Sequence, residues 1–585
     1  MKKIVLSLTA ILSASFLFSQ EALKSTEEEY YDFLSLQGLV ERPTLGYRTL
    51  SDSEWKFIEK EVNEDGNPLT DEAGNKLTNL VMPDHPWKKN NLGTKRTLWQ
   101  GEKGKNCFTR GFDHSLKLKI YGPEWYNSFN TAAPYGQNDG ALWQGKGYNS
   151  SLTGGARLEA YGFEVTLKPQ VSFSQNMAFD LMDNSAYYTN KYAYIWGYGN
   201  NIGVDAPQRF GDSAFWNFDW GDTEIRYSWR TFTIGFGTQS PWVGPAWLNP
   251  ILHSNNAATY PKFDFGLRRT KVYLPFCNWY IGDIEGRIWM GYLTESDYFD
   301  NDSSNDHNRI NGFNFSYAPS FIPGLSIGLT KVCLSKWNSF DIKYMNPFYD
   351  TNGGIGEKVG EDQKASIYAD WICKKIGFEI YGELGIDDYF KDGWIRGLVR
   401  YPFNTTIWTI GLKKSINFSE KHSIKGEIIL ELSDWEEPRT RIIGNEVYAF
   451  NCHHQITQGY TNKGQSIGSA LGVGGNSQLL RFNLYYPKGL SSLQITHINP
   501  DTTFSYIHKC GYDTAKGILV GELETEYYLL KNLRLNACVA YSYITNPYFF
   551  EIDENNNPKK DSNNSEIQTG TMHNFTIKIG AKYNF

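Results

Sequence analysis

Three short segments of the chain combine residue types that occur in catalytic or metal-binding sites. Gly464-Gln465-Ser466-Ile467-Gly468 matches the G-x-S-x-G pattern that presents a nucleophilic serine in hydrolases. That pattern works only on a tight turn from a strand into a helix, whereas a glycine-rich run to Gly475 follows here without a helical spacing of apolar residues. We therefore expect no catalytic serine at this position.

The second segment is acidic and begins like a calcium-binding loop, with the sequence Asp300-Asn301-Asp302-Ser303-Ser304-Asn305-Asp306. Such a loop has a turn glycine at its sixth position and a bidentate glutamate at its twelfth. Here Asn305 and Asn311 occupy those positions. The sequence predicts a solvated acidic loop, and loose calcium binding stays open as the alternative.

The third segment is Cys452-His453-His454, whose neighbours on a strand would point to opposite faces and could not converge on one zinc ion. The seven cysteines include no C-x-x-C pair, and their odd number cannot form a complete disulfide framework, so one or two disulfides stay open. We predict no catalytic site, no cofactor and no metal site.

The first 20 residues have the pattern of a signal peptide. Lys2 and Lys3 precede an apolar run from Ile4 to Phe18, and Ser19 and Gln20 follow. The run is shorter than the roughly 20 residues that a membrane-spanning helix needs. We expect residues 1–20 to be removed on export, and no later stretch is apolar enough to form a transmembrane helix.

Residues 21–105 are predicted to form a periplasmic helical segment and a linker. Apolar residues follow a helical spacing from Glu27 to Gln37, and Gly38 can end that helix. Ser51 to Glu54 reads as a capping box, so we expect a second helix that packs through Trp55, Phe57 and Ile58. Residues 61–79 read as an exposed loop.

From about residue 110 the apolar residues recur at every second position, the period of a strand with one apolar and one polar face. Phe163 to Phe173 is a clear example, and the last strand alternates from Phe575 to the terminal Phe585. The same period recurs in 116–120, 225–229, 284–292, 325–329, 378–384 and 533–543.

These features favour a closed antiparallel outer-membrane β-barrel over residues 106–585, with an ordinary edge strand of a soluble sandwich as the alternative for the last strand. A barrel satisfies every backbone group without water. Trp, Tyr and Phe make up 16% of the chain, which suits aromatic girdles, and the terminal aromatic resembles the signal read by the barrel-insertion machinery. The length leaves room for about 18 strands, with 297–309, 351–364 and 551–566 as extracellular loops.

The charge excludes one class of partner. A net charge of −7 is spread along the 585 residues, and no basic stripe is present. We expect no nucleic-acid binding. The expected surroundings are the outer-membrane lipid.

Several irregular motifs resemble the capsule-assembly Wzi family of outer-membrane proteins. The most specific begins with Trp242-Val243-Gly244-Pro245 and continues with Leu252–Ala257 (LHSNNA) and Pro261. Three further motifs are Tyr135–Gly145 (YGQNDGALWQG), Asp205–Gly211 (DAPQRFG) and Tyr460–Gly464 (YTNKG). Where the family often has two adjacent tryptophans before Gly-Pro, this chain has Trp242 and Val243, so no role is carried over for the second ring.

The resemblance implies an 18-stranded barrel with a periplasmic helical element, which acts as a surface lectin for capsular or exopolysaccharide and is not an enzyme. Loops rich in aromatic, amide and carboxylate side chains suit sugars. The candidate residues for polysaccharide contact are Trp143, Asp139, Trp242, Trp247, Asn255, Asn256 and Arg268.

Two alternatives stay open. Gly244, Pro245, Asn255 and Asn256 either form turns or an inward-folded plug segment that needs these residue types, or contact the ligand directly. At the level of the whole protein, an outer-membrane porin or substrate-selective channel needs only the barrel, and a hydrolase would need a site that the sequence does not supply. We predict a plugged, non-conducting barrel.

Overall fold

The fold is taken from a computed structural model of the chain. It describes residues 26–48, 56–57, 96–101, 115–182, 190–194, 204–300, 302–338, 342–346, 360–387, 399–400, 403, 406–419, 422, 424–436, 450–453, 455–502, 515–530, 532–548, 559–560, 562, 569–583 and 585. The predicted signal peptide and the predicted loop 61–79 lie outside these residues.

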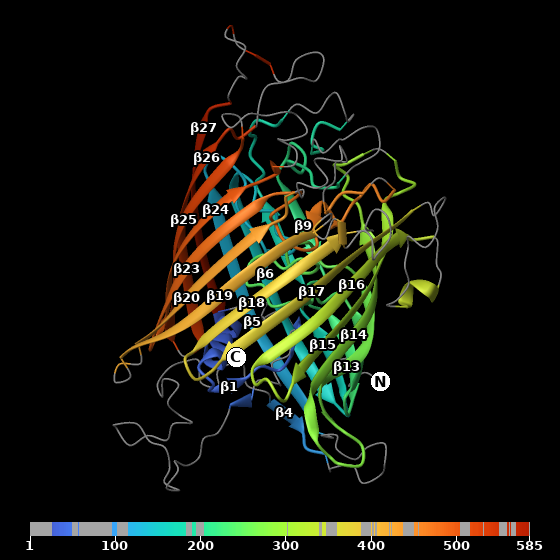
Figure 1. Ribbon diagram of the computed structural model, residues 1–585. Coiled ribbons are helices and arrows are strands. Elements are labelled where there is room, and N and C mark those ends of the chain that lie inside the picture. Colours follow the sequence, from blue (N-terminus) through green and yellow to red (C-terminus); the bar gives the residue numbers. More distant parts are fainter. Residues whose placement is uncertain are drawn as a thin grey trace, which may run out of the picture.

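The chain forms a closed antiparallel β-barrel with tilted strands (Figure 1). The sheet contains 21 strands among the described residues. One of them, β4 (Arg96–Trp99), only extends the edge of β5. Two wall strands are interrupted and are each counted as two, β7 with β8 and β9 with β10, so the wall has 18 strands. The ring closes where the last strand pairs with the first, Thr576 opposite Asn130. The predicted fold class is confirmed.

The wall strands follow one another around the barrel in chain order. They are β5 (Leu116–Asn130), β6 (Gly147–Ala160), β7 (Phe163–Leu167), β8 (Gln170–Ser174), β9 (Phe215–Asp219), β10 (Glu224–Trp229), β11 (Phe232–Gly237), β13 (Lys262–Tyr273), β14 (Tyr280–Thr294), β15 (His307–Pro319), β16 (Leu325–Lys336), β17 (Glu361–Cys373), β18 (Phe378–Asp387), β19 (Thr406–Ser419), β20 (Ile424–Asp434), β23 (Asn476–Tyr486), β24 (Gly489–Asn499), β25 (Gly517–Leu530), β26 (Leu533–Thr545) and β27 (Thr571–Tyr583).

The two-residue period of the sequence sorts side chains between lipid and lumen. In β27, the side chains of Phe575, Ile577 and Ile579 are each about half exposed, at 52%, 53% and 51%, while Asn574 and Thr576 between them are buried. Apolar side chains therefore face outward and polar ones inward, as a membrane barrel requires. Every segment predicted from this period overlaps a strand of the wall.

One predicted strand is interrupted. The stretch from Phe163 to Phe173 is divided at Lys168–Pro169, because proline has no N–H to give to the ladder. The next wall strand breaks at the same level, at Gly221, which bridges to Lys168. Gly221 has φ 57°, and a Cβ there would lie 2.3 Å from the Lys168 carbonyl oxygen. We call this pair of breaks the kinked seam.

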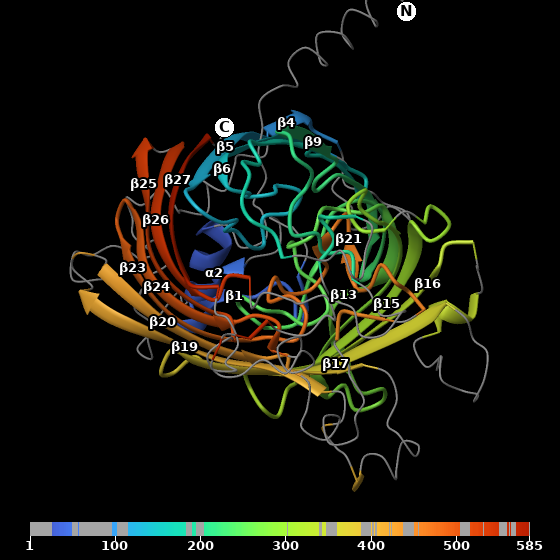
Figure 2. The ribbon, with the colours of Figure 1, turned by 90° about the horizontal axis from the view of Figure 1, so that it is seen from above.

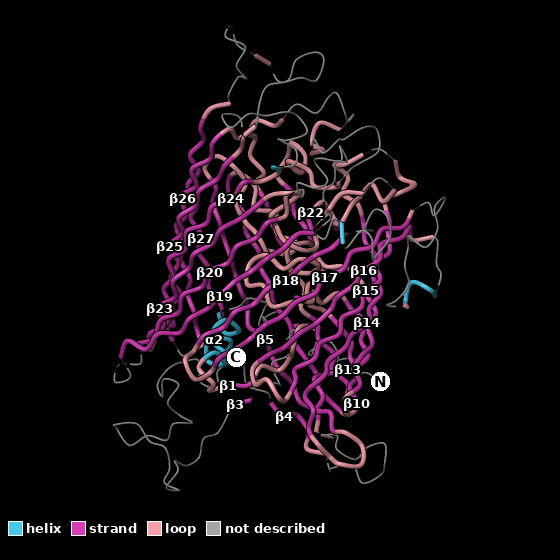
Figure 3. The backbone as a smooth tube through the Cα atoms, in the orientation of Figure 1, coloured by secondary structure: helices cyan, strands magenta, loops and turns pink. Residues whose placement is uncertain are grey.

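Connections at the two ends of the barrel differ in length (Figure 3). At the end that holds β1 (Val40–Glu41) and β4, adjacent strands are joined by tight turns such as Tyr161–Gly162 and Arg230–Thr231. At the other end the connections are long and include the predicted extracellular segment 297–309, whose last three residues already belong to β15. Since periplasmic turns are short, the long connections mark the extracellular end. Residues 351–359 and 551–558 lie outside the described residues.

The N-terminal segment lies within the barrel (Figure 2). The first predicted helix is confirmed as α2 (Thr26–Leu36), whose Tyr30 and Phe33 pack against Tyr485 of β23 with ring centroids 5.4 and 4.5 Å away. Among the described residues, no helix is long and apolar enough to cross a membrane.

The second predicted helix is wrong where the structure describes it. Residues Lys56–Phe57 form the short strand β3, which pairs with β1 (Val40–Glu41). The pairing with β1 is therefore formed in place of the helix that the capping box predicted. Ser51 and Glu54 of that capping box lie outside the described residues.

Long extracellular connections fold back into the barrel. The segment between β11 and β13 contains β12 (Trp242–Val243), which pairs with β2 (Tyr47–Arg48) of the N-terminal segment. The connection between β5 and β6 contacts the same segment, because the Gly140 N–H donates to the Asn255 carbonyl oxygen at 2.8 Å. We call residues 131–146, 238–261 and 455–475 the lumen plug.

The lumen plug has an apolar core of its own against the wall. Ile251, Leu252 and Tyr260 of the plug are buried in one cluster with Trp289 and Ile310 of β14 and β15. The Tyr460 hydroxyl donates to the Leu252 carbonyl oxygen at 2.8 Å. Of the alternatives for Gly244 and Pro245, the structure shows the inward-folded segment.

Candidate functional site

Wall carboxylates hold the lumen plug in place. Glu431 of β20 accepts backbone N–H donors from Trp247 at 2.6 Å, Leu248 at 3.1 Å and Asn249 at 2.8 Å, and the Tyr381 hydroxyl at 2.7 Å. A buried carboxylate that accepts several N–H groups satisfies donors that no regular ladder serves. One side chain of the wall therefore holds the backbone of residues 247–249.

Two further glutamates repeat this arrangement. Glu383 of β18 accepts the Ile251 N–H at 2.9 Å, and Glu285 of β14 accepts the N–H groups of Leu45 at 2.7 Å and Gly46 at 3.1 Å. At Gly244, where φ is 90°, a Cβ would lie 1.5 Å from the Glu383 Oε1. Gly244 is therefore required by both its backbone angle and its closeness to the wall.

An ion-pair cluster ties the N-terminal segment to the wall below the plug. The Arg42 guanidinium binds Asp32 at 2.6 Å, Asp370 at 2.7 Å and Glu379 at 2.7 Å, and Lys413 binds Asp32 at 2.6 Å. Asp32 belongs to α2, whereas Asp370, Glu379 and Lys413 belong to β17, β18 and β19. The cluster therefore joins the helix to three neighbouring wall strands.

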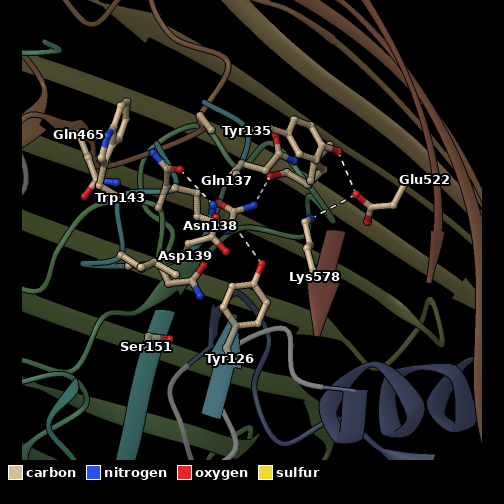
Figure 4. Close-up of a pocket in the computed structure, with 18 of the residues that line it drawn as sticks. Tyr126, Tyr135, Gln137, Asn138, Asp139, Trp143, Ser151, Gln465, Glu522 and Lys578 are labelled. Carbon is tan, nitrogen blue, oxygen red and sulfur yellow. Dashed lines mark hydrogen bonds and ion pairs between the residues drawn. The ribbon is translucent and has the colours of Figure 1, made fainter. Parts of the chain in front are cut away.

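Beside the lumen plug, a cavity of about 640 Å³ remains inside the barrel. It reaches from Glu29 of α2 to Pro500 and Ile518 at the extracellular ends of β24 and β25. Its volume lies within the roughly 300–1,000 Å³ of small-molecule sites. Figure 4 shows its lining, with Tyr135, Lys578 and Glu522 grouped on one side and Trp143 beside Gln465 on the other.

One group of lining residues combines an aromatic face with fixed charges. The Tyr135 hydroxyl donates to Glu522 at 2.9 Å, and the Lys578 ammonium binds the same carboxylate at 3.2 Å. The Lys578 Nζ lies 4.9 Å from the centre of the Tyr135 ring. The Tyr135 ring is thus held in one orientation at the cavity wall.

Other rings of the lining are fixed in similar ways. Arg481 lies over the Trp247 ring at 5.2 Å, Trp143 packs against Phe210 with ring centroids 4.8 Å apart, and the Tyr126 hydroxyl donates to Gln144 at 3.1 Å. Rigid aromatic faces beside polar groups suit ligands that have both apolar faces and hydroxyl groups.

Asp139 supplies a carboxyl group to the same cavity. Burial raises its pKa to about 6, and the positive charge of Lys578 and a hydrogen bond from Gln144 partly oppose that rise. The carboxylate accepts a hydrogen bond from a hydroxyl, and the protonated form, which the raised pKa favours, can donate one.

Five of the seven residues predicted for polysaccharide contact line this cavity: Trp143, Asp139, Trp247, Asn255 and Asn256. Asn256 also supports the plug, because its side chain accepts the Asn138 N–H at 3.0 Å and donates to the Ser466 carbonyl oxygen at 2.9 Å.

The other two predicted residues lie elsewhere. Trp242 is fully buried in β12, where its Nε1 donates to the Ala246 carbonyl oxygen at 3.0 Å and Arg48 lies 5.0 Å from its ring. Arg268 is half-buried on β13 near the periplasmic turn, where its N–H donates to Thr231 at 2.8 Å. Neither residue lines the cavity.

Sequence reasoning missed the residues that the wall contributes, including Tyr126, Arg481, Glu522 and Lys578. One signal for them is present in the sequence: Glu522, Glu524 and Glu526 alternate along β25 and so share its lumen face. The sequence of β25 does not indicate which loops contact this face.

The segments considered for chemistry have other roles. The G-x-S-x-G match lies on a hairpin of β21 (Thr461–Asn462) and β22 (Gln465–Ser466), with Lys463 and Gly464 at its turn, so no helix follows the serine. In the acidic loop, Asp300 accepts the Asp302 N–H at 2.8 Å and Asp302 accepts the Ser304 N–H at 3.0 Å. In the part of the chain that the structure describes, no group of three His, Cys, Asp or Glu side chains could hold a metal ion.

The fold is similar to solved outer-membrane barrels. A structure of Wzi from Escherichia coli, described as a carbohydrate-binding β-barrel involved in group 1 capsule assembly, matches 79% of this chain and 85% of its own with a TM-score of 0.52 and 13% identity. Pseudomonas putida OprB and Pseudomonas aeruginosa OccK2 cover 80% of this chain, and 94% and 97% of their own, at 10% identity with TM-scores of 0.33 and 0.35. No protein-family model and no curated sequence matches.

At 13% identity, the structural similarity to Wzi is evidence for the fold alone. The 18-stranded wall and the short N-terminal helix agree with the expectation drawn from the motifs around Trp242 and Trp143. This chain is an outer-membrane β-barrel with the fold of Wzi.

Proposed function

We propose that this protein is a non-enzymatic outer-membrane protein that binds or anchors exported capsular or surface polysaccharide. The observation that carries the proposal is a barrel in which extracellular loops fold inward beside a polar cavity with aromatic faces. Tyr126, Tyr135, Trp143 and Trp247 offer faces for sugar rings, and Asn138, Asp139 and Gln465 offer groups for hydroxyls.

Each part of the lining has a role in this function. Sugar rings stack on aromatic faces through their C–H groups, while amides and carboxylates bind hydroxyls. The cavity reaches the extracellular ends of β24 and β25, which is the side from which an exported glycan would enter. The lumen plug positions the lining residues in advance, and a preorganised site loses less conformational entropy when a ligand binds.

The proposal is tested in cells by deleting the gene and measuring cell-associated and released polysaccharide separately. We expect polysaccharide to be made in equal total amount but to appear in the medium. Complementation with the native gene restores retention, whereas the variant Trp143→Ala with Tyr135→Ala restores it only in part. Unchanged retention in the deletion strain would contradict the proposal.

A substrate-selective channel is the second candidate, because the cavity runs along the wall from α2 to the extracellular ends of β24 and β25. In that case deletion reduces uptake of a small solute and leaves polysaccharide retention unchanged. The same strain therefore separates the two functions.

A further inference from the structure

The charges that line the cavity are unequal in sign. Seven acidic side chains and four basic ones reach it. On one side Lys578 is paired with Glu522 at 3.2 Å, and Arg481 is paired with Glu524 at 3.2 Å. Both cations are therefore already balanced by carboxylates of β25.

The remaining two cations are balanced in the same way. Arg534 of β26 is paired with Glu526 at 3.2 Å, and Lys168 at the kinked seam is paired with Asp222 at 2.6 Å. Three further acidic residues, Glu29, Glu124 and Asp139, also line the cavity. Every cationic group of the lining thus has a carboxylate partner, and acidic groups are in excess.

This arrangement discriminates between sugars by charge. A carboxylated sugar that enters the cavity must compete with a resident carboxylate for its cation and meets the excess acidic groups, so like-charge repulsion opposes its binding. An uncharged sugar meets neither the competition nor the repulsion. It can still stack on the aromatic faces and form hydrogen bonds with Asp139, Asn138 and Gln465.

We infer that the cavity takes uncharged sugar units of the glycan and rejects units that carry carboxylates. The inference rests on the proposed function, because it names the ligand class of the same site. Glu522 is the residue that sets this preference most directly, since it neutralises Lys578 and is held by the Tyr135 hydroxyl.

The test is calorimetric titration of the purified full chain in detergent with two sets of trisaccharides. The uncharged set is built from glucose, galactose or N-acetylglucosamine, and the acidic set from glucuronate or galacturonate, which differ from the first two sugars only at carbon 6. We expect at least one uncharged sugar to bind about tenfold more tightly than its acidic counterpart, the effect of one unfavourable charge contact.

The variant Glu522→Gln removes the carboxylate and leaves the Lys578 cation in the cavity. In this variant we expect the affinity for the acidic trisaccharide to rise about tenfold, so that the discrimination is lost or reversed. Asp297→Asn is the matched control, because Asp297 is an exposed carboxylate of an extracellular loop outside the cavity. It leaves the preference unchanged.

Three results would overturn the inference: tighter or equal binding of the acidic sugars by the native protein, unchanged discrimination in Glu522→Gln that remains folded by circular dichroism, or no binding of any uncharged sugar. These failures differ from failure of the proposed function. If no sugar enters the cavity while gene deletion still releases polysaccharide, the anchoring function stands and only the cavity assignment is lost.

Discussion

At the scale of single residues, the chain uses wall carboxylates as receptors for loop backbone. Glu285, Glu383 and Glu431 each point into the lumen from a different strand and accept N–H groups of segments far away in sequence. Alternation along a strand predicts that these side chains face inward. It cannot predict which loop they receive, because Glu431 and Trp247 are separated by 184 positions.

Replacing Glu431 tests this role. In Glu431→Ala three backbone N–H groups of residues 247–249 lose their acceptor, and each buried orphan donor costs about 1–3 kcal/mol. We expect the free energy of unfolding to fall by at least about 3 kcal/mol, measured by tryptophan fluorescence in urea.

The control for this prediction is Asp302→Ala. Asp302 is exposed and accepts one N–H at 3.0 Å, so water can replace it and the loss is small. Equal losses for the two variants would contradict the assignment of Glu431 as a plug receptor.

At the scale of elements, strands were predictable and the N-terminal segment only in part. The two-residue period located the strands because each wall strand separates lipid from lumen, and Pro169 explains the interruption between β7 and β8. The capping box at Ser51 indicated a helix, yet Lys56–Phe57 pairs with β1. The helix signal of residues 51–54 fails because the strand partner, β1, lies elsewhere in the sequence.

The attachment of α2 to the wall gives a prediction at this scale. Arg42→Ala leaves Asp32, Asp370 and Glu379 close together without the guanidinium that balances them, and removing one partner of a buried ion pair costs about 3–5 kcal/mol. We expect the N-terminal segment to detach and to be cut by added trypsin at early times, while the wall stays intact on gels.

Arg42→Lys should give an intermediate rate of cleavage, because a single ammonium cannot pair with three carboxylates as the planar guanidinium does. Equal protease resistance of the native protein and Arg42→Ala would show that other contacts hold the segment.

At the scale of the whole molecule, length and motif resemblance were enough for a barrel of about 18 strands. The cavity was not predictable, since its lining comes from eight strands of the wall (β5, β6, β8, β23, β24, β25, β26 and β27) and from three loops that cross the lumen. The sequence motifs located most of the loop residues, including Asp139 and Trp143, because they lie together in one irregular segment.

The filled lumen predicts electrical behaviour. We expect the purified native protein to give no stable large conductance in planar bilayers, because residues 238–261 pack against the wall and the N-terminal segment. The double variant Glu383→Ala with Glu431→Ala releases two anchors of the plug and should open transiently. Large steady currents from the native protein would refute the plugged state.

The order of events during assembly follows from where Arg42 finds its partners. They lie 328 and 337 positions further along the chain, and Leu45 finds Glu285 after 240 positions. Contacts of such separation form slowly, because the intervening chain must be brought together first. The N-terminal segment is therefore made early, but Arg42 can bind the wall only after β17 and β18 have been made.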